Sequence, residues 1–137
     1  MDQSSIASLV AELFSAIHLL AGYPVPADPP EIRFVPQAQL AETVCQRPCR
    51  VRAVYLRDSG IFLDDELDVH GIDLDRSILL HELVHHVRAV TGRYDSLHDD
   101  CTRWTAAEHE AYVLQARYLR QINSPSRIAR PPESRDC

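Results

Sequence analysis

Apolar side chains recur every three or four positions in the first part of the chain, between about Ser4 and Leu20. This spacing places them on one side of a helix with about 3.6 residues per turn. The segment GYPVPADPP follows, and its prolines oppose regular structure because proline fixes φ and lacks a backbone N–H. The pattern therefore predicts an amphipathic helix followed by a segment without secondary structure.

Alternating and β-branched residues predict three short strands after this segment. The first is EIRFV (31–35). The second and third, VRAVYL (51–56) and IFLD (61–64), are joined by the turn RDSG and are expected to pair antiparallel. Residues 38–44 are compatible with a brief helix. The prediction for this region is a short antiparallel sheet.

Two further helices are predicted after the sheet. The first can be capped by Asp73 or Asp75, and Gly92 is suited to end it. Its apolar residues lie on both sides, which is typical of a buried helix. The second runs from about 101–102 to 122, with Trp104 expected as a core anchor.

A chain of 137 residues is long enough for one core of useful size. We therefore predict a small single α+β domain over residues 1–122. The tail at residues 123–137 is rich in proline, serine and arginine, and is expected to be disordered.

The net charge of −6 opposes binding to nucleic acid or to an anionic membrane surface. No stretch is expected to supply the roughly 20 apolar residues that cross a bilayer. The apolar first helix lacks the positive segment of a secretory signal. The prediction is a cytoplasmic protein without nucleic-acid or membrane partners.

The first helix after the sheet contains His81-Glu82-Leu83-Val84-His85, an HExxH pattern. Histidines four residues apart lie one turn apart on the same helix face, so their ring nitrogens can converge on one ion. Glu82 is rotated by about 100° from His81, which places its carboxylate beside that ion. The pattern predicts a Zn²⁺ cofactor held by His81 and His85, with Glu82 as the general base that takes a proton from water.

A zinc site of this kind needs a third protein ligand and leaves one position for water. The last helix offers Glu108 and Glu110 in the sequence EHEAY. Glu108 falls in the helix sector that carries most apolar residues, where a carboxylate is costly to bury without a partner. Glu110 falls on the other side and can pair with Arg117 on a solvated face. We predict Glu108 as the third ligand, with Glu110 as the alternative.

The sequence HELVH followed on the next helix by EHEAY resembles the gluzincin arrangement. The segment Val51–Gln121 is also similar to the small peptidase domains of the ImmA/IrrE group, which have an edge strand, an HExxH helix and then E-x-x-A. The resemblance implies a zincin-like fold in which the HExxH helix packs against the glutamate-bearing helix, a zinc ion, and a peptide bound along the edge strand. By position it assigns His81, His85 and Glu108 as metal ligands and Glu82 as the base.

Four residues after Glu108, members of that group often carry Asn or Asp, and this chain carries Tyr112. The resemblance therefore does not supply the residue that orients a ligand histidine. His86 is expected to pack on the apolar side of its helix. Four side chains are candidates to stabilise the oxyanion formed when water attacks a carbonyl: Tyr112, Tyr94, His98 and His109.

The function expected is that of a zinc-dependent metallopeptidase acting on a peptide or protein substrate. Two alternatives stay open. Cys45 and Cys49, together with the two histidines of HELVH, have ligand types suited to a structural Cys2His2 zinc site without activity. The histidines can also be packing residues of a metal-free interaction module. The cysteines, which include Cys101 and Cys137, are thiols in a reducing cytosol and can form disulfides after export.

Overall fold

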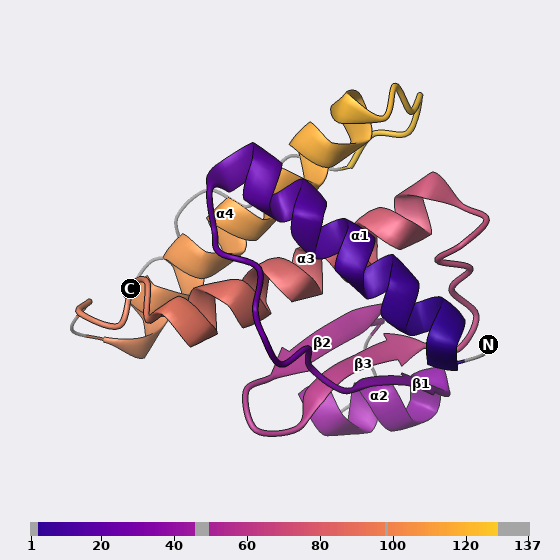
Figure 1. Cartoon of the computed structure of the whole chain (residues 1–137). Coiled ribbons are helices and arrows are strands. Elements are labelled where there is room, and N and C mark those ends of the chain that lie inside the picture. Colours follow the sequence, from indigo (N-terminus) through magenta and orange to yellow (C-terminus); the bar gives the residue numbers. More distant parts are fainter. Residues whose placement is uncertain (1–2, 46–49, 98, 129–137) are drawn as a thin grey trace.

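The computed structural model describes residues 3–45, 50–97 and 99–128. The described chain forms a small α+β domain, which confirms the predicted fold class (Figure 1). Every predicted helix and strand is present, with ends that shift by one or two residues. In chain order the elements are α1 (Gln3–Ala21), β1 (Ile32–Val35), α2 (Gln37–Cys45), β2 (Ala53–Leu56), β3 (Gly60–Asp64), α3 (Asp73–Thr91) and α4 (Asp100–Gln121).

The sheet is mixed, whereas the sequence predicted an antiparallel one. β2 and β3 do pair antiparallel, with Ala53 opposite Leu63. β1 pairs with β3 in the parallel sense, with Ile32 opposite Ile61. Gly60 has φ 103°, and a Cβ at this position would lie 2.4 Å from the carbonyl oxygen of Glu31, so glycine permits the close approach of β1. The resulting strand order, β1-β3-β2, places β2 at an edge of the sheet.

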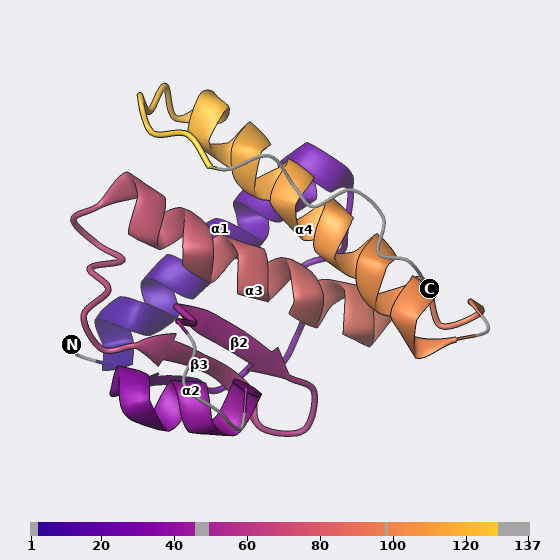
Figure 2. The same ribbon diagram turned by 180° about the vertical axis from the view of Figure 1, so that it is seen from behind.

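Helices cover both faces of this sheet. In both ribbon views α2 lies on one side, while α1 and α3 lie on the other (Figures 1 and 2). The central strand β3 is buried accordingly, with Ile61 and Leu63 fully shielded from solvent. α4 packs along α3 on the side away from the sheet. α3 therefore lies between β2 and α4, and side chains from all three elements can meet.

The ends of α3 differ in how well the sequence predicted them. The N-cap residue is Ile72, which makes no side-chain capping bond. Asp73 and Asp75 lie instead in the first turn, where negative charge interacts favourably with the helix dipole. Asp75 accepts a hydrogen bond from the backbone N–H of Asp68 at 2.9 Å. At the other end Gly92 adopts the left-handed conformation (φ 73°), as predicted.

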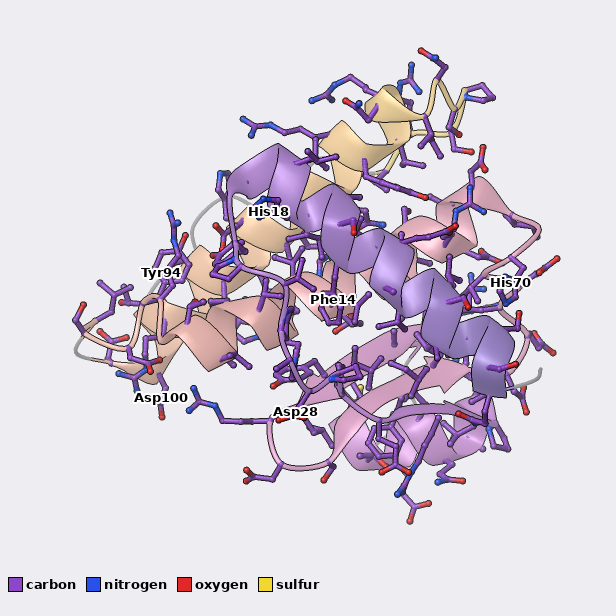
Figure 3. All side chains as sticks on the ribbon, viewed as in Figure 1. Phe14, His18, Asp28, His70, Tyr94 and Asp100 are labelled. Atoms are coloured by element: carbon purple, nitrogen blue, oxygen red, sulfur yellow. The ribbon has the colours of Figure 1, made fainter. Side chains whose placement is uncertain are left out.

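The sequence was expected to contain no stretch long and apolar enough to cross a bilayer. α1 corrects this expectation, because by length and composition it is a helix that can cross a membrane. Core helices of folded domains pass the same test. In this structure one face of α1 packs into the core, and Figure 3 shows Phe14 among the side chains between α1 and the elements behind it. The Phe14 ring centroid lies 6.1 Å from that of His86 on α3. The buried residues of α1 are Ile6, Leu9, Val10, Leu13, Phe14 and Ile17.

Packing continues for a short distance beyond α4. Ser124 is 5% exposed, and its backbone N–H donates to the carbonyl oxygen of Leu119 at 2.9 Å. The first residues of the predicted tail are therefore held against the domain. The remainder of that tail, residues 129–137, lies outside the described residues.

Candidate metal centre

His81, His85 and Glu108 meet at the contact between α3 and α4. Nε2 of His85 lies 2.5 Å from Oε1 of Glu108, and Nε2 of His81 lies 3.2 Å from the same oxygen. The three potential ligand atoms all lie within 4.8 Å of one another, and they form the one such group found among the described residues. The histidines are 6% and 9% exposed. Two imidazoles and a carboxylate therefore converge in a largely shielded position.

Local sequence explains how α4 brings Glu108 to α3. Asp99 caps α4, and its side chain accepts a hydrogen bond from the backbone N–H of Thr102 at 2.7 Å. Ala107 and Ala111 are 4% and 0% exposed. Their small side chains are compatible with a close approach of the two helices, which lets the Glu108 carboxylate reach the histidines.

Glu110 points away from the histidines. Its Oε1 accepts a hydrogen bond from the hydroxyl of Tyr23 at 2.6 Å, and its Oε2 lies 3.6 Å from Nε of Arg93. Two residues along a helix correspond to a rotation of about 200°, so the two carboxylates leave α4 in opposite directions. Glu110 has these two partners in place of the suggested Arg117, which is exposed. The geometry places Glu108 at the histidine pair.

A buried amide holds the other nitrogen of His81, and the sequence did not single it out for this role. Oε1 of Gln115 lies 3.0 Å from Nδ1 of His81, and Nε2 of Gln115 lies 3.0 Å from the hydroxyl oxygen of Ser77. That hydroxyl lies 2.6 Å from the carbonyl oxygen of Leu74. Gln115 and Ser77 are 4% and 0% exposed. The signal available in the sequence was a long polar amide within the inward sector of α4.

The carbonyl oxygen of Leu74, at the end of this series of hydrogen bonds, fixes the direction of each of them. A carbonyl oxygen only accepts, so the Ser77 hydroxyl donates to Leu74 and has only lone pairs left for Gln115. Gln115 must therefore donate its amide N–H to Ser77 and turn its oxygen toward His81. That oxygen accepts the proton on Nδ1 of His81. In neutral His81 the lone pair is then on Nε2, the nitrogen that faces Glu108.

Charges in this site perturb one another. Burial by itself raises the pKa of Glu108, but hydrogen bonds from His81 and His85, which donate through Nε2 when their rings are protonated, outweigh it and lower that pKa to about 2. Burial tends to lower the pKa of His81, and the hydrogen bond to Glu108 together with the charge of Glu82 raises it overall. Such mutual shifts are typical of clustered functional groups.

Glu82 lies beside this group. It is 7% exposed, and its Oε2 lies 4.0 Å from Nε2 of His81. Burial raises the pKa of its carboxyl group, against the opposing effect of His81 and His85. A buried carboxyl with a raised pKa next to two imidazoles has the properties of a general base.

The three ligand candidates and Glu82 line a cleft of about 780 Å³, a size usual for ligand sites. The edge strand β2 forms another wall through residues that include Ala53, Val54 and Tyr55. Trp104 also lines the cleft and is 43% exposed, so the prediction of a core anchor was wrong. The physical reason is that the first turn of α4 faces this opening and not the core.

The four oxyanion candidates lie in different places. Tyr112 lines the cleft, and its ring centroid lies 4.6 Å from that of His81. Burial and the nearby Glu108 and Glu82 raise the pKa of Tyr112, so its hydroxyl keeps its proton. Tyr94 lies at the α3–α4 connection beside Arg93 (Figure 3). His109 is on the exposed side of α4, and His98 lies outside the described residues.

His86 packs as the sequence predicted. Its ring lies between Phe14 and Tyr55, and its Nδ1 is 3.3 Å from the Tyr55 hydroxyl. Burial lowers its pKa. It therefore lies on the apolar side of α3, as expected, and packs there against side chains of α1 and β2.

Cys45 and Cys101 are both disulfide-bonded, whereas Cys49 and Cys137 lie outside the described residues. A sulfur atom in a disulfide is not a thiolate, so Cys45 offers no ligand for the suggested Cys2His2 site in this structure. Disulfides are a feature of proteins in oxidising compartments. The cytoplasmic location expected from the sequence stays a prediction.

Together, fold and site define an α+β domain with a His-His-Glu cluster in a cleft beside an edge strand. A family model described as "Domain of unknown function (DUF6647)" matches residues 2–128, so the chain belongs to the DUF6647 family. No curated protein and no solved structure matches the chain significantly.

Proposed function

We propose that this protein is a zinc-dependent metallopeptidase, in which His81, His85 and Glu108 hold the metal and Glu82 is the general base. The observation that carries the proposal is the convergence of these three ligand atoms within 4.8 Å, with the Glu82 carboxylate 4.0 Å from one of them. The similarity to gluzincins and to the ImmA/IrrE group, noted from the sequence, supports the same assignment.

The donor set fits zinc. Two imidazole nitrogens and one carboxylate oxygen are the ligands of a catalytic zinc site that leaves a fourth position open. Tetrahedral bonds of about 2.0–2.1 Å separate neighbouring ligand atoms by about 3.3 Å. The distance of 3.2 Å between His81 and Glu108 agrees with this value, and the distance of 2.5 Å for His85 is shorter. Gln115 leaves the lone pair of His81 on the nitrogen that faces the site.

When bound, zinc supplies a Lewis acid that polarises a carbonyl group and makes water a better nucleophile near neutral pH. The protein side chains supply the rest of the chemistry. The Glu82 carboxylate accepts the proton of the attacking water and then donates it to the leaving amine. The Tyr112 hydroxyl, in the same cleft, donates a hydrogen bond to the negative charge that develops on the substrate oxygen.

The edge strand β2 positions the substrate in this proposal. An extended peptide can add to a free sheet edge through main-chain hydrogen bonds, which hold it without regard to its side chains. Tyr55 of β2 lies close enough to Glu82 for its backbone N–H to lower the pKa of that carboxyl group. A peptide held on β2 therefore passes directly by the proposed base.

The test combines metal analysis with a Glu82→Gln variant. Protein purified without chelator is expected to hold one zinc ion per chain and to cleave an unfolded protein or a synthetic peptide pool. Glu82→Gln should keep its zinc and lose about 10²–10⁴-fold in rate, the usual contribution of a general base. Glu12→Gln makes the same chemical change on the exposed face of α1 and should leave the rate unchanged.

Two results would contradict the proposal. A Glu82→Gln protein that cleaves at the original rate shows that Glu82 is not the base. Protein without any transition metal supports the alternative of a metal-free interaction module.

A further inference from the structure

Positive charge gathers at the cleft of a protein whose overall charge is negative. The net charge is −6, and all 14 cationic side chains are arginines. Three carboxylates line the cleft, and two of them, Glu82 and Glu108, belong to the proposed metal centre. The third is Asp95. Five arginines line the same cleft: Arg50, Arg52, Arg57, Arg88 and Arg103.

Most of these arginines already have partners. Arg52 lies 3.8 Å from a carboxylate oxygen of Asp64. Arg57 donates to the carbonyl oxygen of Ala89 at 3.1 Å, and Arg103 donates to Asp100 and to the carbonyl of Leu97. Their guanidinium groups are therefore partly engaged within the domain.

Arg88 differs from them. Its Nε is buried and has no hydrogen-bond partner among the described residues. Leaving a buried donor without an acceptor costs about 1–3 kcal/mol. An acceptor in the cleft that bonds the guanidinium of Arg88 recovers part of this cost once the side chain turns Nε toward it. The side chain is thus prepared for a ligand that carries an acceptor, and a negatively charged one is favoured by the neighbouring arginines.

The position of Arg88 connects it to the proposed centre. It follows His85 by three residues on α3, so it lies on the same helix face and about 4.5 Å further along the axis. Residues of an extended peptide are about 3.4 Å apart. Consider a peptide whose reacting carbonyl lies at His81 and His85. The side chains that are within about two residues of the reacting bond then lie close to Arg88.

A carboxylate is the group that suits this site. The planar guanidinium of arginine binds a carboxylate through two parallel N–H···O bonds, a geometry that lysine does not offer. Trp104 adds an apolar surface to the same cleft. The negative net charge of the chain opposes a nucleic-acid ligand, although nucleic acids also carry acceptor oxygens.

We infer that the cleft selects peptides with a carboxylate within two residues of the bond presented to the metal centre, and that Arg88 binds this carboxylate. The inference rests on the proposed peptidase function and deepens it by naming the substrate class. The carboxylate can belong to an Asp or Glu side chain or to the C-terminus of the peptide.

The experiment uses zinc-loaded full-length protein and a synthetic decapeptide pool, supplied with free-acid and with amidated C-termini. Mass spectrometry identifies the cleaved bonds. Acidic residues are expected to be enriched about tenfold within two positions of those bonds, the size of one charge-assisted hydrogen-bonded pair. Arg88→Gln should remove the enrichment and Arg88→Lys should restore part of it. Arg117→Gln, which removes a charge from an exposed position outside the cleft, should leave it intact.

The two pools separate the two sources of the carboxylate. Cleavage confined to bonds near free-acid C-termini identifies the terminal carboxylate. Cleavage of both pools beside Asp or Glu identifies the side chain. Cleavage without any acidic enrichment overturns the inference and leaves the peptidase proposal intact.

If no peptide is cleaved although zinc is bound, the peptidase proposal fails, and a binding measurement then decides the inference. Zinc-loaded Glu82→Gln protein is titrated with a glutamate-containing peptide and with its glutamine analogue. Binding of the glutamate peptide about tenfold more tightly supports the inference. Equal affinities overturn it, as does tighter binding of a single-stranded oligonucleotide than of the acidic peptide.

Discussion

Gln115 accepts a hydrogen bond from Nδ1 of His81 across a distance of 3.0 Å, with both side chains buried between α3 and α4. The Ser77 hydroxyl sets the orientation of the Gln115 amide, because it donates to the Leu74 carbonyl. Partners of this kind fix the tautomer of a metal-binding histidine and increase its basicity. In the proposed metal site, Gln115, seven residues after Glu108, thus supplies the contact to a ligand histidine that the resemblance to the ImmA/IrrE group did not supply.

Replacing Gln115 by Met keeps the side-chain length and removes the acceptor for His81. The zinc affinity is expected to fall about 10–100-fold, measured by competition with a chelator. Nitrogen-15 chemical shifts of the His81 ring should show the proton on Nδ1 in the original protein and a mixture of tautomers in Gln115→Met. Gln121→Met, at an exposed position of the same helix, is the control. An unchanged His81 tautomer would mean that Gln115 serves packing alone.

The two glutamates of α4 provide a matched pair of variants. Glu108→Ala removes a proposed ligand and should lower the zinc content of the purified protein to well below one ion per chain. Glu110→Ala removes the partner of Tyr23 and Arg93 and should keep the zinc, with a loss of stability of about 1 kcal/mol for the broken hydrogen bond. Elemental analysis measures the zinc content per chain, and urea denaturation measures the free energy of unfolding. Zinc retained in Glu108→Ala and lost in Glu110→Ala would reverse the assignment.

Tyr112 is the oxyanion candidate that lines the cleft. Tyr112→Phe removes only its hydroxyl and should reduce kcat by about 10²-fold, the loss typical of one oxyanion donor. KM and zinc content should change little, because the hydroxyl acts on charge that develops during the reaction. Tyr94→Phe, at the α3–α4 connection, is the matched control. A loss of zinc in Tyr112→Phe would point to a structural role beside His81.

Asp64 gives a pH dependence of stability that is independent of the metal centre. Burial by itself raises its pKa, but the backbone N–H of Glu66 and the amide of Gln37 outweigh it and lower the pKa below the usual 3.8. A carboxyl group whose pKa is lower in the folded state stabilises the protein above its unfolded pKa, and this contribution is lost as the pH falls. The free energy of unfolding should therefore decrease below about pH 4. Asp64→Asn should show a smaller decrease in urea titrations at several pH values, and an identical decrease would exclude this origin.

Helices and strands were largely predictable because their signals are local. The spacing of apolar residues in α1, the turn RDSG between β2 and β3, and Gly92 at the end of α3 each act within a few neighbouring positions. The parallel pairing of β1 with β3 was not predictable in this way. This pairing joins strands that are separated in the sequence by α2 and β2. It depends on how those two elements fold to bring β3 beside β1.

The side chains of the candidate site also fall into two groups: those whose placement follows from local sequence and those that only the tertiary structure places. His81, Glu82 and His85 share one helix, so their mutual arrangement follows from the 3.6-residue period and could be derived from the sequence alone. The choice between Glu108 and Glu110, the contact of Gln115 with His81, and the exposure of Trp104 depend on how α4 is rotated against α3. That rotation is set by packing between residues far apart in the sequence, at the α3–α4 contact and in the core where Ala111 is buried, and only the tertiary structure decides it.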